Sequence, residues 1–296
     1  MLQIEGASIA YGHDILFSNF NLQLRRGEIA CISGSSGCGK TSLLNAILGF
    51  TPLKEGRITV NNIVSDKNSI DLIRKQIAWI PQELALPLEW VKDMIQLPFS
   101  LKANRATPFS EMQLFNCFEE LGLEEELYYK RVNEISGGQR QRIGIARALI
   151  VKPTMVIADE PISALDVSIQ AQVINVLNDL KKEMGLTILF IAHDLSVVKY
   201  FSDTIGVMYR GRIVEMGEAD KVYRNPLHPY TKSLISSIPL PNPHGEKRRV
   251  RISYDPSLYH YDADEKLQMR PVEEGHSILC TQSEYAGYLE QAKAFS

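Results

Sequence analysis

One octapeptide, residues 34–41, constrains the fold of this chain more than any other feature. It reads Gly-Ser-Ser-Gly-Cys-Gly-Lys-Thr and fits the pattern GxxxxGK[ST] at every fixed position. An apolar segment at residues 29–33 precedes it, and a helix-like stretch at residues 43–48 follows it. This order predicts a phosphate-binding loop, because glycines let backbone N–H groups approach a phosphate and the helix N-terminus adds partial positive charge.

The pattern assigns separate tasks to the members of this loop. We predict that Lys40 bridges the β- and γ-phosphates of a nucleotide and that the Thr41 hydroxyl binds Mg²⁺. The predicted nucleotide-binding residues of the loop are Gly34, Ser35, Ser36, Gly37, Cys38, Gly39, Lys40, Thr41 and Ser42. A plain Gly/Ser turn is the alternative, but with Gly at ~7% of residues a chance match is on the order of one in a hundred.

A second candidate element is the apolar segment 154–158, which ends in Asp159 and Glu160. Neighbouring residues of a strand point to opposite sides, so these two carboxylates have different tasks. Asp159 suits the Mg²⁺ shell beside a phosphate loop. Glu160 is then placed to activate the attacking water as a general base. Solvated acids at a strand end are the alternative, which the phosphate loop makes less favourable.

The remaining pattern predicts an α/β fold. The segments 29–32, 155–158 and 186–192 are almost continuously apolar, as in strands buried on both faces of a mainly parallel sheet with crossover helices. Apolar residues recur at period two, typical of antiparallel strands, at Phe20, Leu22, Leu24, Ile58 and Val60. They recur at helix spacing at Leu114, Phe115, Phe118 and Leu121, which predicts a helical insertion between Gln82 and Ser136.

Composition excludes several classes of protein. Lys plus Arg is 32 against 35 for Asp plus Glu, a formal charge of −3, which argues against a protein that coats duplex nucleic acid. The four cysteines form no CxxC pair and indicate a reducing compartment. The first residues show no secretory signal, and the longest apolar run is too short to span a bilayer. We therefore expect a cytoplasmic protein that partners hold at any membrane it serves.

The stretch 135–142, Ile-Ser-Gly-Gly-Gln-Arg-Gln-Arg, is a second candidate anion site at a helix start. It resembles the signature motif of ATP-binding cassette (ABC) ATPases and lies, as in that family, just before an acidic strand. The resemblance makes Ser136, Gly137, Gly138 and Gln139 nucleotide-binding residues. It implies a P-loop NTPase fold, with a RecA-like mainly parallel sheet, an antiparallel β subdomain and an inserted helical subdomain.

Other family positions follow in order along residues 1–220. Tyr11 matches the aromatic residue that stacks on adenine, and Gln82 matches the glutamine that senses Mg²⁺ and contacts the transmembrane partner. The segment 163–166, Ser-Ala-Leu-Asp, matches the part that crosses the dimer interface, which makes Asp166 a nucleotide-site residue. His193 matches the switch histidine that reaches the γ-phosphate. Mild departures are Ile135, where Leu is usual, and Cys38 in the phosphate loop.

The resemblance also implies a mechanism and a set of partners. In this family two cassettes pack head to tail, and each ATP lies between the phosphate loop of one and the signature motif of the other. ATP with Mg²⁺ closes the pair, Glu160 and His193 support hydrolysis, and the motion passes to membrane subunits through the Gln82 region. The metal-binding residues expected from this likeness are Thr41, Gln82 and Asp159.

The C-terminal part indicates a branch of the family. Residues 225–234, Asn-Pro-Leu-His-Pro-Tyr-Thr-Lys-Ser-Leu, look like the NPxHPYT segment of ATPases from oligopeptide and dipeptide importers. The tail from Tyr254 to His276 is similar to the F-type ATPase subunit of such importers in Gram-positive bacteria. Those systems pair two non-identical ATPases, at the cytoplasmic face of the membrane, with two permeases and an external binding protein. His276 and Cys280 share the spacing of one helix face, and we interpret them as surface residues.

We expect an ABC domain at residues 1–240, with its helical subdomain at about 83–135, and a weakly structured extension at 241–296. The short insertion suggests a second hypothesis, a mosaic chain with a junction near residue 136, whose transport partner would follow the N-terminal half. The family also contains ATPases of different importers and of exporters, homodimers as well as heterodimers, and soluble cassettes of DNA repair or translation. A regulatory module without turnover would be a different class of protein, and the intact Glu160 and His193 argue against it.

Overall fold

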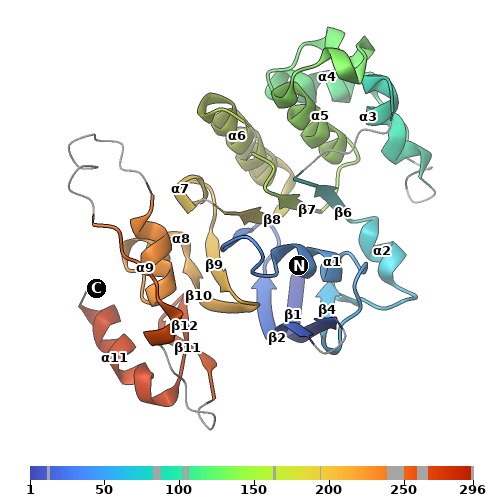
Figure 1. The fold of residues 1–296 in the computed structure, drawn as a ribbon. Coiled ribbons are helices and arrows are strands. Elements are labelled where there is room, and N and C mark those ends of the chain that lie inside the picture. Colours follow the sequence, from blue (N-terminus) through green and yellow to red (C-terminus); the bar gives the residue numbers. More distant parts are fainter. Residues whose placement is uncertain are drawn as a thin grey trace.

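The protein is described here by a computed structural model (Figure 1). The described residues are 1–296 without 12–13, 83–87, 102–103, 105–106, 163–164, 194, 239–249, 259–265 and 295–296. The chain forms two sheets, with helices gathered mainly at the upper end of the view and beside the C-terminal part (Figure 1).

The larger sheet has eight strands in the order β11-β12-β10-β9-β3-β8-β7-β6. Five neighbouring strands, from β9 to the edge strand β6, form its parallel part. They are β3 (Ile29–Ser33), β6 (Ile77–Ile80), β7 (Met155–Asp159), β8 (Thr187–Ala192) and β9 (Thr204–Tyr209). These five run parallel to one another, and every residue of β3, β7 and β8 is buried. The prediction of an α/β fold with a mainly parallel sheet is therefore confirmed.

The smaller sheet is antiparallel, in the order β2-β1-β4-β5. Its strands are β1 (Leu2–Tyr11), β2 (Asp14–Leu24), β4 (Glu55–Val60) and β5 (Ile63–Val64). The period-two residues Phe20, Leu22, Leu24, Ile58 and Val60 are all buried, as predicted. They share one hydrophobic cluster with the buried side of α1 (Lys40–Ile47), so this sheet covers the helix that follows the phosphate loop.

The helices of the upper part belong to a second cluster, on the other face of the large sheet. They are α3 (Val91–Ser100), α4 (Glu111–Glu120), α5 (Gly137–Leu149) and α6 (Val167–Met184), with short 3₁₀ turns at Glu125–Tyr129 and Val132–Glu134. Leu114, Phe118 and Leu121 are fully buried, which confirms the helical insertion. Shorter helices are α2 (Ile70–Arg74), α7 (Leu195–Val198) and α8 (Ala219–Arg224). Within the described part of the chain, no helix has the length and apolar character needed to cross a membrane.

The C-terminal part is more ordered than its sequence pattern indicates. A hairpin of β11 (Gln268–Glu273) and β12 (His276–Cys280) continues the large sheet beyond β10 (Arg212–Glu218), and α11 (Gln282–Lys293) covers it. The expectation of weak secondary structure after residue 240 is wrong for residues 268–293. The expected boundary at residue 240 itself lies outside the described residues.

The interpretation of His276 and Cys280 as surface residues of a helix is also wrong. Both lie on β12, with exposed fractions of 1% and 0%. Residues four apart share a face of a strand as well as of a helix, so the spacing could not distinguish the two. The His276 imidazole instead lies between Glu215 and Glu273, with its Nε2 2.8 Å from the Glu215 carboxylate.

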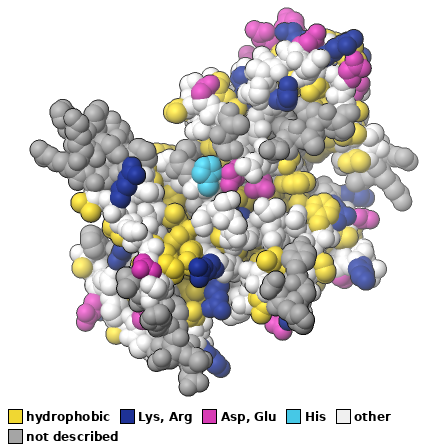
Figure 2. Space-filling model, viewed as in Figure 1, with side chains coloured by type: hydrophobic (Ala, Val, Ile, Leu, Met, Phe, Trp, Pro, Cys, Tyr) yellow, Lys and Arg dark blue, Asp and Glu magenta, His cyan; other side chains and the backbone are white. Residues whose placement is uncertain are grey.

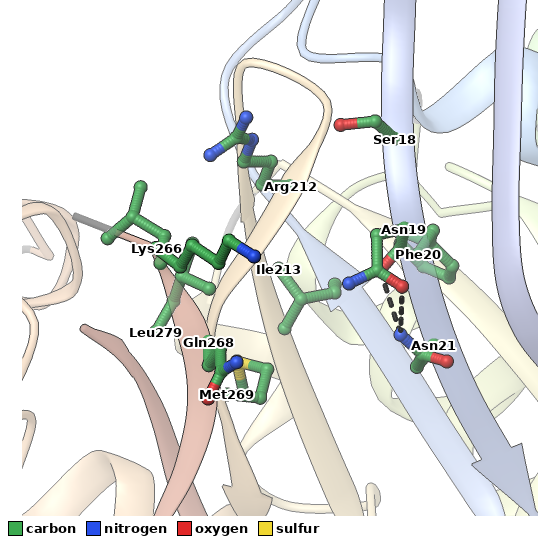
Figure 3. A pocket seen from close by; sticks show the side chains of 11 residues that line it. Ser18, Asn19, Phe20, Asn21, Arg212, Ile213, Lys266, Gln268, Met269 and Leu279 are labelled. Atoms are coloured by element: carbon green, nitrogen blue, oxygen red, sulfur yellow. Dashed lines mark hydrogen bonds between the residues drawn. The ribbon is translucent and has the colours of Figure 1, made fainter. Parts of the chain in front are cut away.

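An open hollow of about 410 Å³ separates the C-terminal hairpin from the outer strand β2. Figure 3 shows Lys266 beside the hairpin, Arg212 at the start of β10, and Asn19 and Asn21 on β2. Ile213 lies between Lys266 and Asn19 in this view, and both Ile213 and Phe20, which also line the hollow, are buried. The C-terminal part therefore adjoins the antiparallel sheet across a polar-rimmed gap, while backbone hydrogen bonds join it to the large sheet.

Candidate active site

The phosphate loop lies between the end of β3 and the start of α1, as predicted. Gly39 is the N-cap of α1 with a φ of 107°, and no side chain caps this helix. Gly34 must be glycine for another reason, since a Cβ there would lie 2.1 Å from the backbone oxygen of Met208 on β9. The loop thus packs closely against the sheet while the start of α1 stays without a side-chain partner.

Lys40 is buried, and its ammonium is held by the loop itself. Its Nζ donates to the backbone oxygens of Gly34, at 2.6 Å, and Ser35, at 3.1 Å. The neighbouring Cys38 thiol lies 3.9 Å from Nζ, and burial raises its pKa. A buried cation that two backbone oxygens hold in the loop is a suitable partner for a polyphosphate.

Two contacts from outside the motif hold the loop, and the sequence analysis missed both. Gly211, in the turn between β9 and β10, donates its N–H to the Cys38 oxygen at 2.9 Å. The Ser35 N–H donates to the Tyr230 hydroxyl at 2.9 Å. Tyr230 stands in the HPYT segment, so that segment was a signal, although the sequence does not relate it to residue 35.

The carboxylates Asp159 and Glu160 end β7 beside this loop. Asp159 is buried, and its pKa is raised by burial and by Glu160, while the charge of Lys40 opposes the rise. Glu160 has a φ of 46°, an unfavourable backbone conformation for a residue with a side chain. Such conformations cluster at functional sites, where the surrounding structure holds them.

Glu160 brings together two other predicted residues that are distant in sequence. Gln82, two residues after β6, donates its amide to Glu160 Oε2 at 3.2 Å, and His193 Nδ1, just after β8, lies 3.0 Å from the same oxygen. Figure 2 shows one exposed histidine beside acidic side chains near the centre of this face, and His193 is the one described histidine that is exposed. Three strand ends therefore meet at one carboxylate.

The signature segment forms a helix start of a different kind. Ser136 caps α5, since its Oγ accepts from the Gln139 N–H at 3.1 Å, and the Gln139 amide oxygen accepts from the Ser136 N–H at 2.9 Å. Ser136 and Gly137 are exposed. Among the described residues, no hydrogen bond or ion pair joins Ser136, Gly137, Gly138 or Gln139 to residues 34–42. One chain therefore does not bring these two segments together.

The structure describes the remaining predicted residues only in part. Asp166 is the N-cap of α6 and accepts from the Ile169 N–H at 3.1 Å and the Ser168 hydroxyl at 2.8 Å, and these bonds lower its pKa. The side chain of Tyr11 and residues Ser163 and Ala164 lie outside what the structure describes. The adenine-stacking role and most of the interface segment stay predictions.

Comparison with known proteins identifies relatives along the whole chain. The ABC transporter family matches residues 17–163, and the C-terminal region of oligopeptide/dipeptide transporters matches residues 214–263. The oligopeptide transport ATP-binding protein OppF of Bacillus subtilis (strain 168) is 45% identical over 91% of both chains. The dipeptide transport ATP-binding protein DppF of Lactococcus lactis subsp. cremoris (strain MG1363) is 42% identical over 95% of this chain and 92% of its own.

A solved structure, the dimeric ABC transporter cassette MJ0796, superposes with a TM-score of 0.66 at 28% identity, over 74% of this chain and 99% of its own. The same cassette was solved with ADP and phosphate bound, at a TM-score of 0.65. Relatives that match across residue 136 remove the reason for the hypothesis of a mosaic chain.

Proposed function

The chain belongs to the ABC transporter ATP-binding proteins, ATPases that drive transport, and we propose that it powers the import of oligopeptides or dipeptides. One observation carries the proposal: a single chain combines the ABC match at residues 17–163 with the peptide-transporter match at residues 214–263. Relatives that are named for oligopeptide or dipeptide transport support the same solute class.

We assign the hydrolytic step to Glu160. Its carboxylate lies within hydrogen-bond reach of both Gln82 and His193, so a water bound among them can give its proton to Glu160 while it attacks the γ-phosphate. Lys40, held by the loop, neutralises the negative charge of the phosphates. His193, with its exposed ring, is suited to contact the γ-phosphate and to report its loss.

The residues present fit a magnesium ion that enters together with the nucleotide. Thr41 offers a hydroxyl oxygen and Asp159 a buried carboxylate, which are the oxygen donors that Mg²⁺ prefers, and Gln82 offers an amide oxygen. The described residues contain no group of three or more His, Cys, Asp or Glu side chains able to hold a metal. When bound, Mg²⁺ would polarise the phosphates, and phosphate oxygens would complete its shell.

We propose that two chains of this type form the working unit, with two permease subunits, at the cytoplasmic side of a membrane. The signature segment is exposed and does not reach the phosphate loop of its own chain, so a second cassette must supply it. An external solute-binding protein would deliver the peptide to the permeases, and nucleic acid has no part in the cycle. The partner cassette is either a copy of this chain or a related ATPase.

A groove beside β6, the strand that leads to Gln82, suits a permease segment. It is a hollow of about 630 Å³ between α2, β6 and the helices α3 and α5. Trp79 and Leu101 line it with exposed fractions of 41% and 54%, between the charged side chains of Arg74 and Arg147. An apolar floor with a charged rim fits a short amphipathic helix. Movement there would reach Glu160 through β6 and Gln82.

Uptake of a labelled tripeptide tests the proposed function. Cells that lack this chain should lose uptake and regain it with the wild-type gene, but not with Glu160→Gln. Glu183→Gln, which changes an exposed glutamate near the end of α6, is the matched control and should restore uptake. Normal peptide uptake without the chain, with loss of another solute's uptake, would show that a different importer uses this ATPase.

A further inference from the structure

The peptide group between Gly34 and Ser35 is held from both sides. Its carbonyl accepts from Lys40 Nζ at 2.6 Å, and its N–H donates to the Tyr230 hydroxyl at 2.9 Å. The described chain contains no cis peptide bond, so these two groups point in opposite directions from one planar unit. A rotation of this peptide would therefore break both contacts at once.

The Tyr230 hydroxyl is itself held in a fixed place. Tyr230 has an exposed fraction of 6%, and its ring packs against Tyr209 and Tyr254, with centroids 4.5 and 5.4 Å away. Its backbone N–H donates to Nδ1 of His228, the N-cap of α9 (Pro229–Ser236). A large ring in a buried aromatic cluster at a helix start has few other positions open to it.

The start of α9 is fastened in turn to the large sheet. The buried Glu215 carboxylate on β10 accepts the N–H groups of Leu227, at 2.8 Å, and His228, at 2.9 Å. The same carboxylate pairs with His276 of the C-terminal hairpin. A continuous set of hydrogen bonds thus runs from β12 through β10 and α9 to the phosphate loop.

We propose that Tyr230 is a positioning residue for the nucleotide. Its hydroxyl fixes the orientation of the Gly34–Ser35 peptide, which keeps the Lys40 ammonium against the Gly34 carbonyl oxygen before a nucleotide arrives. ATP then binds to a lysine that needs no reorganisation, and this preorganisation raises the affinity. The inference rests on the proposed phosphate-binding role of Lys40, and it gives the HPYT segment a task at the ATP site.

Tyr230→Phe removes the hydroxyl and keeps the ring. The dissociation constant for ATP should rise about fivefold, as the loss of one hydrogen bond predicts, when calorimetry measures it on the purified chain. The amide resonance of Ser35 should shift in the ¹⁵N spectrum of the nucleotide-free protein. Tyr209→Phe, which removes a hydroxyl from the same aromatic cluster, should leave both readouts unchanged. Wild-type affinity in Tyr230→Phe, or an equal loss in Tyr209→Phe, would overturn the proposal.

A second variant tests the same bond from its donor side. Ser35→Pro removes the N–H that Tyr230 accepts, so Tyr230→Phe should cause no further loss of ATP affinity in that background. If Tyr230→Phe weakens binding by the same factor with and without the Ser35 N–H, then Tyr230 acts through packing alone and the proposal is wrong. These measurements need no transporter, so a failed peptide assignment would leave them intact. If Lys40→Ala retained full affinity, the phosphate-loop assignment and this inference would both fall.

Discussion

The two helix starts that the sequence marks as anion sites differ in how their backbone groups are used. At α1 the N-cap is Gly39 and no side chain caps the helix, while the Lys40 ammonium is buried beside it. At α5 the side chains of Ser136 and Gln139 cap each other's backbone N–H groups, and the segment is exposed. The N-terminus of α1 is therefore open, without a side-chain cap, and it carries a buried cation. The N-terminus of α5 is closed, because its own side chains cap it, and its first three residues are uncharged.

This difference explains how two similar motifs can do different work. An open start with a cation is ready to bind polyphosphate within one chain. A capped start is a stable surface, which presents the Ser136 hydroxyl and the glycine backbone to a neighbour. Of these two helix starts, only that of α1 should therefore affect ATP binding by one chain, whereas turnover should depend on both.

The largest expected effect is the loss of ATP hydrolysis, without loss of ATP binding, when Glu160 beside the phosphate loop is changed. Glu160→Gln removes the proposed general base but keeps the size and shape of the side chain, so hydrolysis should fall by roughly 10²–10⁴-fold. ATP should still bind, and the closed pair of chains should accumulate. Steady-state phosphate release and size-exclusion chromatography with ATP measure the two results, with Glu183→Gln as control. Wild-type hydrolysis would mean that another group activates water.

Lys40→Ala tests whether the open helix start suffices without its cation. The loss of a buried charge partner should weaken ATP binding by about a thousandfold, which takes it below the range of calorimetry. Lys54→Ala, at an exposed lysine, is the control and should bind ATP normally. Retained affinity in Lys40→Ala would contradict the assignment of residues 34–41 as the phosphate-binding loop.

A third helix start, that of α9, uses a neutral imidazole as its cap and should respond to pH. Burial, with a smaller contribution from Lys232, lowers the pKa of His228 to about 4, against the attraction of Glu215. A lowered pKa means that His228 stabilises the fold above pH 6.5 and that this contribution is lost as the pH falls towards 4, up to roughly 3 kcal/mol.

Urea unfolding between pH 7 and pH 4.5 measures this loss. His228→Asn keeps a capping acceptor without a titrating ring, so its free energy of unfolding should fall less steeply in that range. His276 should act in a different pH range. Burial lowers its pKa, but Glu215 and Glu273 raise it further, so the stability that His276 contributes is lost as the pH rises above 6.5. If the free energy of unfolding of the wild type and of His228→Asn changed with pH in parallel, a buried neutral His228 would be contradicted.

The smallest effect concerns the closed helix start. Ser136→Ala removes the cap of α5 and should cost about 1 kcal/mol of stability, while ATP binding by the isolated chain stays normal and ATP hydrolysis falls. Ser136→Asp, which retains a capping oxygen, should recover the stability. Thermal unfolding and calorimetry provide the two readouts. Weakened ATP binding by the isolated chain would show that both helix starts serve one site within one chain.

Much of the site could be predicted because its chemistry depends on short segments. The phosphate loop needs glycines, a lysine and a hydroxyl in one contiguous stretch, and the buried strands need apolar runs. Asp159 and Glu160 follow such a strand directly. In the helical insertion, the apolar residues at 114–121 recur over more than one helical turn, so the helix could be predicted from their spacing. Each of these features is local, so residue order alone carries it.

Other features could not be predicted because they depend on pairs that are distant in sequence. His276 and Cys280 have a spacing that suits a strand as well as a helix, and only their pairing with β10 decides between them. The meeting of Gln82, Glu160 and His193 needs the order of β6, β7 and β8 in the sheet. The Asp166 carboxylate caps α6, which the interface motif does not indicate.

Residue order alone was enough to identify the fold class and the family and to predict the phosphate loop and the two carboxylates, because each depends on short contiguous motifs. Three features emerged only with the folded chain: the C-terminal hairpin joins the large sheet, Tyr230 reaches the Ser35 amide 195 positions away, and the signature segment stays apart from its own loop. These features depend on strand order, because hydrogen bonds and packing act between neighbours in space and strand order sets which residues become neighbours.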